Sequence, residues 1–174
     1  MSDKKALVVI DMQNDYLWKS RKEMFSYDTA ELTGSVNKAI DSYQAKGYDI
    51  IYIAQMFPNI ITNKWIIGFS IKGTEGAELF SGLDIRSDLY FEKNLPDSYT
   101  SKSFRDHMKR MDYKEVVLCG IDECGCVGAT AKGAVKTGAD VYLLENCTGC
   151  RFSHEKELKM RNSLLSLGVR YITV

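Results

Sequence analysis

The feature that most constrains the fold is a regular alternation of short apolar segments with amphipathic helical segments along the whole chain. The apolar segments span residues 6–11, 49–54, 89–93, 115–119, 140–144 and 170–174. The helical segments span 29–46, 102–111, 126–137 and 153–167. Apolar runs that alternate with helices indicate a parallel sheet covered by helices on both faces. We therefore predict an α/β fold with three layers (α/β/α) and a mainly parallel, Rossmann-like sheet of six strands.

Length and composition narrow the class of protein. The 174 residues fit one domain spanning 1–174, and 45% hydrophobic and 26% charged residues are ordinary for a globular protein. Lys plus Arg equals Asp plus Glu at 23 each, which argues against a broad nucleic-acid surface. No apolar run is long enough to cross a membrane, and no signal peptide is visible. We expect a cytoplasmic protein with five reduced cysteines.

Three reactive residues follow predicted strands. Asp11 ends the first apolar run, Lys93 ends the third, and Cys126 lies after a short turn that follows the fourth. The carboxyl ends of parallel strands meet at one edge of a sheet, so we expect these side chains to lie together. A thiol at the start of a helix becomes a nucleophile when a cation stabilises its thiolate and a carboxylate accepts its proton. The pattern is typical of acyl transfer, although each residue alone has an ordinary structural interpretation.

The segment 55–88 interrupts the alternation and contains four glycines and a proline. A long insertion at the carboxyl end of a strand usually forms a pocket wall or a partner surface. Its apolar residues Trp65, Ile66, Ile67 and Phe69 fit a substrate pocket and a subunit interface equally well.

Four motifs, in order along nearly the whole chain, resemble those of the isochorismatase-like cysteine hydrolases, a family that includes nicotinamidases. They are Asp11-Met-Gln-Asn-Asp-Tyr16, Gly73-Thr-Glu-Gly-Ala-Glu-Leu79, Lys93 followed by Asp97-Ser98-Tyr99, and Gly120-Ile121 through Ala131 around Cys126. Each motif alone is moderately specific, but four in the family's order are a strong signal.

The resemblance implies a role for each matching residue. Cys126 would be the nucleophile, Asp11 the general acid/base, and Lys93 the charge that supports both. A cis peptide at Ile121–Asp122 would present the amides of Asp122 and Cys126 as an oxyanion hole. We expect the substrate pocket to include Tyr16, Gln55, Phe57, Trp65 and Tyr99. The activity implied is cleavage of a C–N bond in a small amide or carbamoyl compound, through a thioester and without a cofactor.

The chain departs from the family at several positions. Nicotinamidases carry an Asp-x-His metal motif where this chain has Gln55-Met-Phe57-Pro, so we predict no metal site. Glu123 and Cys124 replace the family's usual residues before the nucleophile. We expect the carboxylates of Asp122 and Glu123 to raise the pKa of the Cys126 thiol and to oppose Lys93.

The remaining cysteines and histidines receive structural interpretations. The Cys124-x-Cys126 spacing fits neither a redox motif nor a zinc knuckle, whereas Cys147-x-x-Cys150 has a metal-like spacing without a second pair. We expect structural thiols near the pocket, and we assign no role to Cys119. His107 and His154 lie in helical segments and are expected at the surface.

Two other functions remain open at this stage. An isochorismatase-type enzyme hydrolyses a vinyl ether without a nucleophilic cysteine, and Cys126 argues against it. A binding or regulatory protein that has lost hydrolysis is suggested by the residues at 123 and 124. For the enzyme we expect a small-molecule substrate and a homo-oligomer, either a dimer or a tetramer, as is common in the family.

Overall fold

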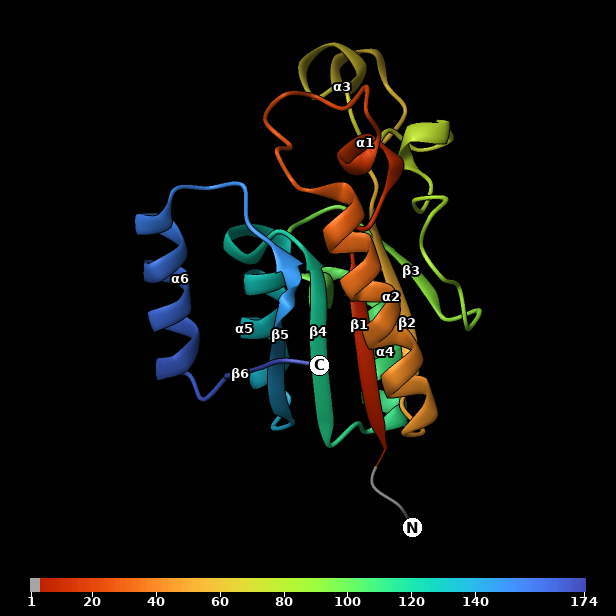
Figure 1. Ribbon diagram of the computed structural model, residues 1–174. Helices are drawn as coiled ribbons and strands as arrows, with labels where there is room; N and C mark the ends of the chain where they lie inside the picture. Colours follow the sequence, from red (N-terminus) through yellow and green to blue (C-terminus); the bar gives the residue numbers. More distant parts are fainter. Residues whose placement is uncertain (1–3) are drawn as a thin grey trace.

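The computed structural model describes residues 4–174 and shows six strands in one parallel sheet (Figure 1). The strand order is β3-β2-β1-β4-β5-β6. The strands are β1 (Lys5–Ile10), β2 (Asp49–Gln55), β3 (Tyr90–Lys93), β4 (Glu115–Ile121), β5 (Asp140–Gly149) and β6 (Arg170–Ile172). The α-helices are α1 (Asn14–Leu17), α2 (Thr29–Ala45), α3 (Ile61–Ile66), α4 (Lys102–Met111), α5 (Gly128–Val135) and α6 (His154–Ser166). The predicted α/β fold with a six-stranded parallel sheet is confirmed.

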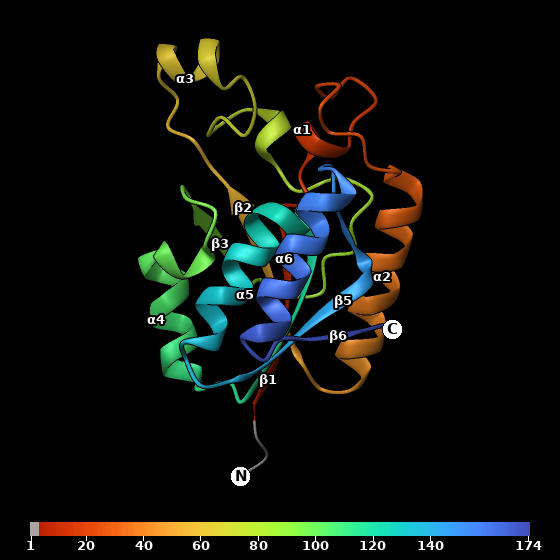
Figure 2. The same ribbon diagram turned by 90° about the vertical axis from the view of Figure 1, so that its left-hand side faces the viewer.

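Helices cover both faces of this sheet, and their apolar residues form two separate cores. One core packs Leu7 and Val9 of β1 against Val36 and Ile40 of α2. The other packs the alternate strand residues against α4, α5 and α6, which lie across the sheet from α2 (Figure 2). Because neighbouring side chains of a strand point to opposite faces, a strand covered on both sides must be apolar throughout. The continuous apolar run of β1 meets this requirement.

The largest differences from the predicted elements lie at the carboxyl edge of the sheet. Strand β5 continues to Gly149, five residues beyond the predicted end, and β6 stops at Ile172. The segment 55–88 contains the short helix α3 and a 3₁₀ turn at Glu75–Ala77, and it extends above the strand ends (Figure 1). Short helices have too few turns to show a periodic apolar pattern, so sequence periodicity does not detect them. Among the described residues, no helix is long and apolar enough to cross a membrane.

Gly120 in β4 leaves room for the backbone of the neighbouring central strand β1. It pairs with Ile10 and has φ of 111°, and a Cβ atom added there would lie 2.1 Å from the carbonyl oxygen of Ile10. We expect Gly120→Ala to lower the free energy of unfolding by about 2–5 kcal/mol, because both the backbone conformation and the contact become strained. Urea denaturation followed by circular dichroism measures this change.

The matched control for this prediction is Gly34→Ala on the exposed face of α2. A Cβ atom at Gly34 has no other atom within 4 Å, and its φ is not positive. Alanine should therefore stabilise the protein by roughly 0.5–1 kcal/mol through its helix propensity. Equal effects of the two substitutions would contradict the structural role of Gly120.

Candidate active site

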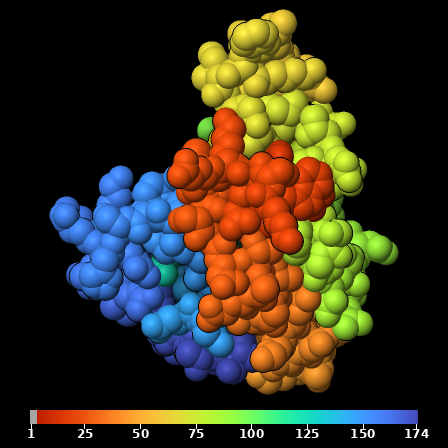
Figure 3. All heavy atoms as spheres, turned by 45° about the horizontal axis from the view of Figure 1, so that its top comes forward, coloured from red at the N-terminus to blue at the C-terminus, as the bar shows by residue number. Residues whose placement is uncertain are grey.

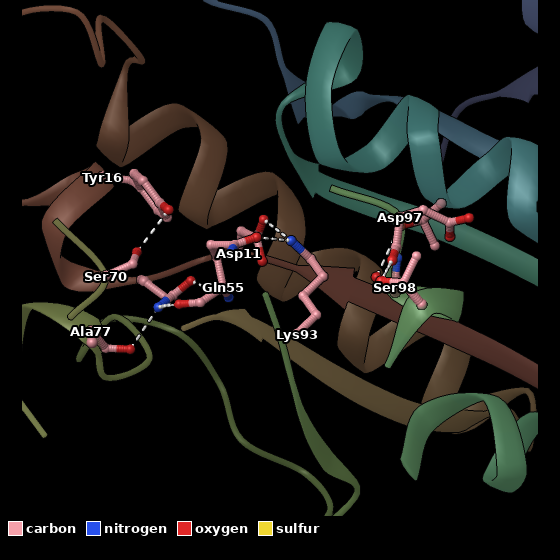
Figure 4. Close-up of polar contacts among 11 residues, drawn as sticks. Asp11, Tyr16, Gln55, Ser70, Ala77, Lys93, Asp97 and Ser98 are labelled. Atoms are coloured by element: carbon pink, nitrogen blue, oxygen red, sulfur yellow. Dashed lines mark hydrogen bonds and ion pairs between the residues drawn. The ribbon is translucent and has the colours of Figure 1, made fainter. Parts of the chain in front are cut away.

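The carboxyl ends of three adjacent strands bring Asp11, Gln55 and Lys93 together. Asp11 directly follows β1, and Gln55 and Lys93 are paired last residues of β2 and β3. Lys93 Nζ donates to Asp11 Oδ2 at 2.9 Å and to Gln55 Oε1 at 2.7 Å (Figure 4). Asp11 and Lys93 are 3% and 2% exposed, so this ion pair is buried. A buried charge requires such a partner, because burial without one costs several kcal/mol.

A second glutamine holds this arrangement in place. Gln13 Oε1 accepts from the backbone amide of Gln55 at 2.9 Å, and Gln13 Nε2 donates to the carbonyl of Gln55 at 3.0 Å. The same Nε2 donates to the carbonyl of Ala77 at 2.6 Å, which ties the 55–88 segment to the strand ends (Figure 4). Gln13 is fully buried, so these contacts fix the backbone that carries Gln55.

The carboxylate of Asp11 uses only one of its two oxygens. Oδ2 accepts from Lys93, whereas Oδ1 is buried and has no hydrogen-bond partner among residues 4–174. Buried polar atoms in folded proteins are nearly always hydrogen-bonded. The free oxygen is thus available to a proton donor that enters the site.

Cys126 lies in an irregular turn between β4 and α5. The Ile121–Asp122 peptide is cis, as the family resemblance implied, and Glu123–Val127 then forms a π turn. The carboxylate of Asp122 accepts from the backbone amide of Cys124 at 2.9 Å and from the Tyr27 hydroxyl at 2.8 Å. These contacts hold the turn, which carries the thiol, against the loop before α2.

The thiol of Cys126 is electrostatically coupled to both Asp11 and Lys93. Burial raises the pKa of the Cys126 thiol, the negative charge of Asp11 raises this pKa further, and Lys93 lowers it. For Lys93, the charges of Asp11 and Cys126 outweigh burial and raise the pKa of the ammonium group. The structure therefore places the three predicted residues in one cluster, with a thiol whose pKa is raised.

The expectation that Glu123 acts on this thiol is wrong. The Glu123 side chain is 1% exposed, accepts from the Tyr171 hydroxyl at 2.9 Å and lies 3.5 Å from Nε of Arg161. Burial and Asp11 are the largest causes that raise the pKa of Cys126. Glu123 faces α6 and β6, so its charge is neutralised away from the thiol.

A cavity of about 380 Å³ opens above Asp11 and Cys126, both of which line it. This volume suits a small molecule, since ligand pockets usually measure about 300–1,000 Å³. Tyr16, Gln55 and Phe57, which were expected in a pocket, line it together with Ile121 and Asp122 of the cis-peptide turn. The walls also contain aromatic residues that sequence reasoning missed, namely Phe25, Tyr27, Phe69 and Phe152.

Two predicted pocket residues lie elsewhere. Trp65 is 84% exposed on α3, at the outer end of the protruding 55–88 segment (Figure 3). Tyr99 is 9% exposed and packs on Phe104 in the core under α4, with its ring centroid 5.0 Å from that of Phe104. Neither side chain lines the cavity. The interpretation of Trp65 as part of a subunit interface stays a prediction.

The positions of the family's metal motif do not fit a metal ion. Gln55 Oε1 already accepts from Lys93, and Phe57 presents an aromatic ring to the cavity. These two side chains therefore offer no metal ligands.

His107, which was expected at the surface, is instead 5% exposed and hydrogen-bonded to the Tyr113 hydroxyl at 3.2 Å.

The remaining thiols lie in two places. Cys119 and Cys147 are fully buried in the core beneath α2. Cys124 lies in the Glu123–Val127 turn and Cys150 lies next to it, with their Sγ atoms 3.5 Å apart and the Asp122 carboxylate within 4.8 Å of both. Both oxygens of Asp122 accept hydrogen bonds, so this carboxylate helps to hold the turn in place.

Comparison with known proteins identifies the family. The model of the isochorismatase domain matches residues 5–170. This chain belongs to the isochorismatase family. The uncharacterized family member YddQ of Bacillus subtilis is 25% identical over 142 residues, which cover 81% of this chain and 75% of YddQ. The family resemblance seen in the sequence is thus confirmed.

Solved structures of the family have the same fold. A pyrazinamidase of Pyrococcus horikoshii in complex with zinc aligns with a TM-score of 0.83 and 23% identity, over 98% of this chain and 99% of its own. An N-carbamoylsarcosine amidase from Thermoplasma acidophilum aligns with a TM-score of 0.78 and 21% identity, over 98% and 96%. At this identity the likeness establishes the fold of this isochorismatase-family chain.

Proposed function

We propose that the protein is a cysteine hydrolase that cleaves a C–N bond in a small amide or carbamoyl compound. Membership of the isochorismatase family supports a hydrolase, and the amidases among its structural neighbours favour a C–N bond. The observation that carries the proposal is the free Oδ1 of Asp11, at the floor of a cavity that Cys126 also lines.

The proposed reaction begins with proton transfer. The raised pKa of the Cys126 thiol favours its protonated form, and Asp11 takes the proton as the sulfur attacks the carbonyl carbon. Lys93 pairs with the buried Asp11 carboxylate and favours the forming thiolate.

The remaining steps complete the cycle. The amides of Asp122 and Cys126 stabilise the oxyanion of the tetrahedral intermediate. Asp11 returns its proton to the departing nitrogen, the C–N bond breaks, and a thioester remains on Cys126. Water, activated by Asp11, then hydrolyses the thioester and regenerates the thiol. No step requires a cofactor.

The thioester can be tested directly. We expect hydrolysis of an accepted amide in the presence of hydroxylamine to yield a hydroxamate, because a thioester partitions between water and a stronger nucleophile. Rapid quenching followed by mass spectrometry should show the acyl group on the peptide that contains Cys126. Vinyl-ether hydrolysis forms no acyl intermediate, so product formation without hydroxamate or acylated Cys126 would contradict the proposal.

A further inference from the structure

Arg151 is a charged residue of the cavity wall, and its guanidinium has no partner among the described residues. Three charged residues line the cavity, and two of them are satisfied. Asp11 pairs with Lys93, and both oxygens of Asp122 accept hydrogen bonds. The guanidinium of Arg151 makes no hydrogen bond or ion pair with any residue between 4 and 174. The cavity therefore presents a guanidinium whose N–H donors are free to bind a ligand.

The guanidinium is nevertheless held in position. The backbone amide of Arg151 donates to Asp122 Oδ2 at 2.8 Å, which fixes the start of the side chain. Its guanidinium carbon lies 4.2 Å from the ring centroid of Phe152 and 5.5 Å from that of Phe25. Arginine stacks on aromatic faces while its N–H groups remain free to bind in the plane of the guanidinium. These contacts orient the five donors without using them.

We infer that the substrate carries a carboxylate, bound by Arg151, beside an apolar or aromatic group. This inference rests on the proposed function, since it concerns the same cavity. A guanidinium matches the planar geometry of a carboxylate and binds it through two parallel hydrogen bonds. The aromatic rings of Tyr16, Phe57 and Phe69 supply an apolar wall for the rest of the molecule. The carboxylate anchors the substrate and is not altered in the reaction.

Binding of two compounds that differ only in the carboxylate tests the inference. N-carbamoyl-phenylalanine and phenethylurea share the aromatic ring and the ureido group. Titration calorimetry in the Cys126→Ala background measures binding without turnover. We expect the acid to bind roughly tenfold to a hundredfold more tightly, because a charge-assisted hydrogen-bonded pair contributes about 1.5–3 kcal/mol.

Substitution of the arginine then assigns the effect to one residue. Arg151→Gln should remove the preference for the acid and leave the affinity for phenethylurea unchanged. Arg151→Lys should keep part of the preference for the acid. Both variants retain the backbone bond to Asp122, so the turn stays in place. Lys156→Gln is the matched control, because Lys156 also lies over the Phe152 ring, at 5.0 Å, but does not line the cavity.

Equal affinity for the two compounds, binding of neither, or a preference that survives Arg151→Gln would overturn the inference. These outcomes are separate from a failure of the proposed hydrolysis. Carboxylate-selective binding by a protein that never releases ammonia would contradict the proposed function alone. Hydrolysis of neutral amides without any preference for acids would contradict the role of Arg151 alone.

Discussion

Replacing Cys126 by alanine is expected to lower the rate of amide hydrolysis by about 10⁴-fold or more, because the atom that forms the thioester is removed. Ammonia release, measured with an amide that the wild-type protein accepts, checks this result. The substitution removes one sulfur atom from a partly exposed turn, so thermal unfolding should remain close to that of the wild type. A fully active variant would show that the mechanism is wrong.

Cys124→Ala is the matched control for the nucleophile. Cys124 lies two residues earlier in the same π turn, and its Sγ contacts Cys150 instead of lining the cavity. We expect hydrolysis within a few-fold of the wild type, since Cys124 contacts neither Asp11 nor Lys93. A loss as large as that of Cys126→Ala would indicate that the geometry of the turn, and not the thiol of Cys126, limits the reaction.

Replacing Lys93 by methionine is expected to abolish hydrolysis and to lower the free energy of unfolding by about 3–5 kcal/mol. The substitution leaves the buried carboxylate of Asp11 without its partner, and an unpaired buried charge is strongly destabilising. Chemical denaturation measures the stability. Lys72→Met is the control, because the Lys72–Glu92 pair is exposed at the surface and should contribute no more than about 1 kcal/mol.

A double variant separates the structural role of the pair from its catalytic role. Asp11→Asn combined with Lys93→Met removes both charges, so part of the lost stability should return relative to Lys93→Met alone. Hydrolysis should remain absent, because neither the base nor the supporting cation is present. Recovery of activity in the double variant, or additive losses of stability, would mean that the two residues do not act as a pair.

The alternation of strands and helices along the chain could be predicted from local patterns. Apolar runs such as the one before Asp11 are continuous because both faces of the sheet are covered, and this requirement is visible in sequence. The same topological rule places Asp11, Lys93 and Cys126 at one edge, and the structure has them there. Arg151 also follows a strand end, by two residues, so the same rule indicates that it lies at this edge.

Other features depend on contacts between distant segments, and the sequence did not predict them correctly or at all. Trp65 was expected in the pocket, yet α3 carries it outward into solvent. Phe25 and Tyr27 reach the cavity from the loop before α2, where no periodic pattern signals their position. His107 is polar in sequence but buried, because Tyr113 provides a hydrogen-bond partner. Such contacts are set by how loops fold over the sheet.

By itself, the sequence determined the order of strands and helices, the family and the three residues at the strand ends. These follow from local periodicity and from motifs that are contiguous in the chain. The tertiary structure decided which carboxylate acts on the thiol, assigning this effect to Asp11 and directing Glu123 toward Arg161 and Tyr171. It also decided which charged and aromatic residues line the cavity. The reason is physical, since pKa values and pocket shape depend on distance and burial, which spacing along a chain does not specify.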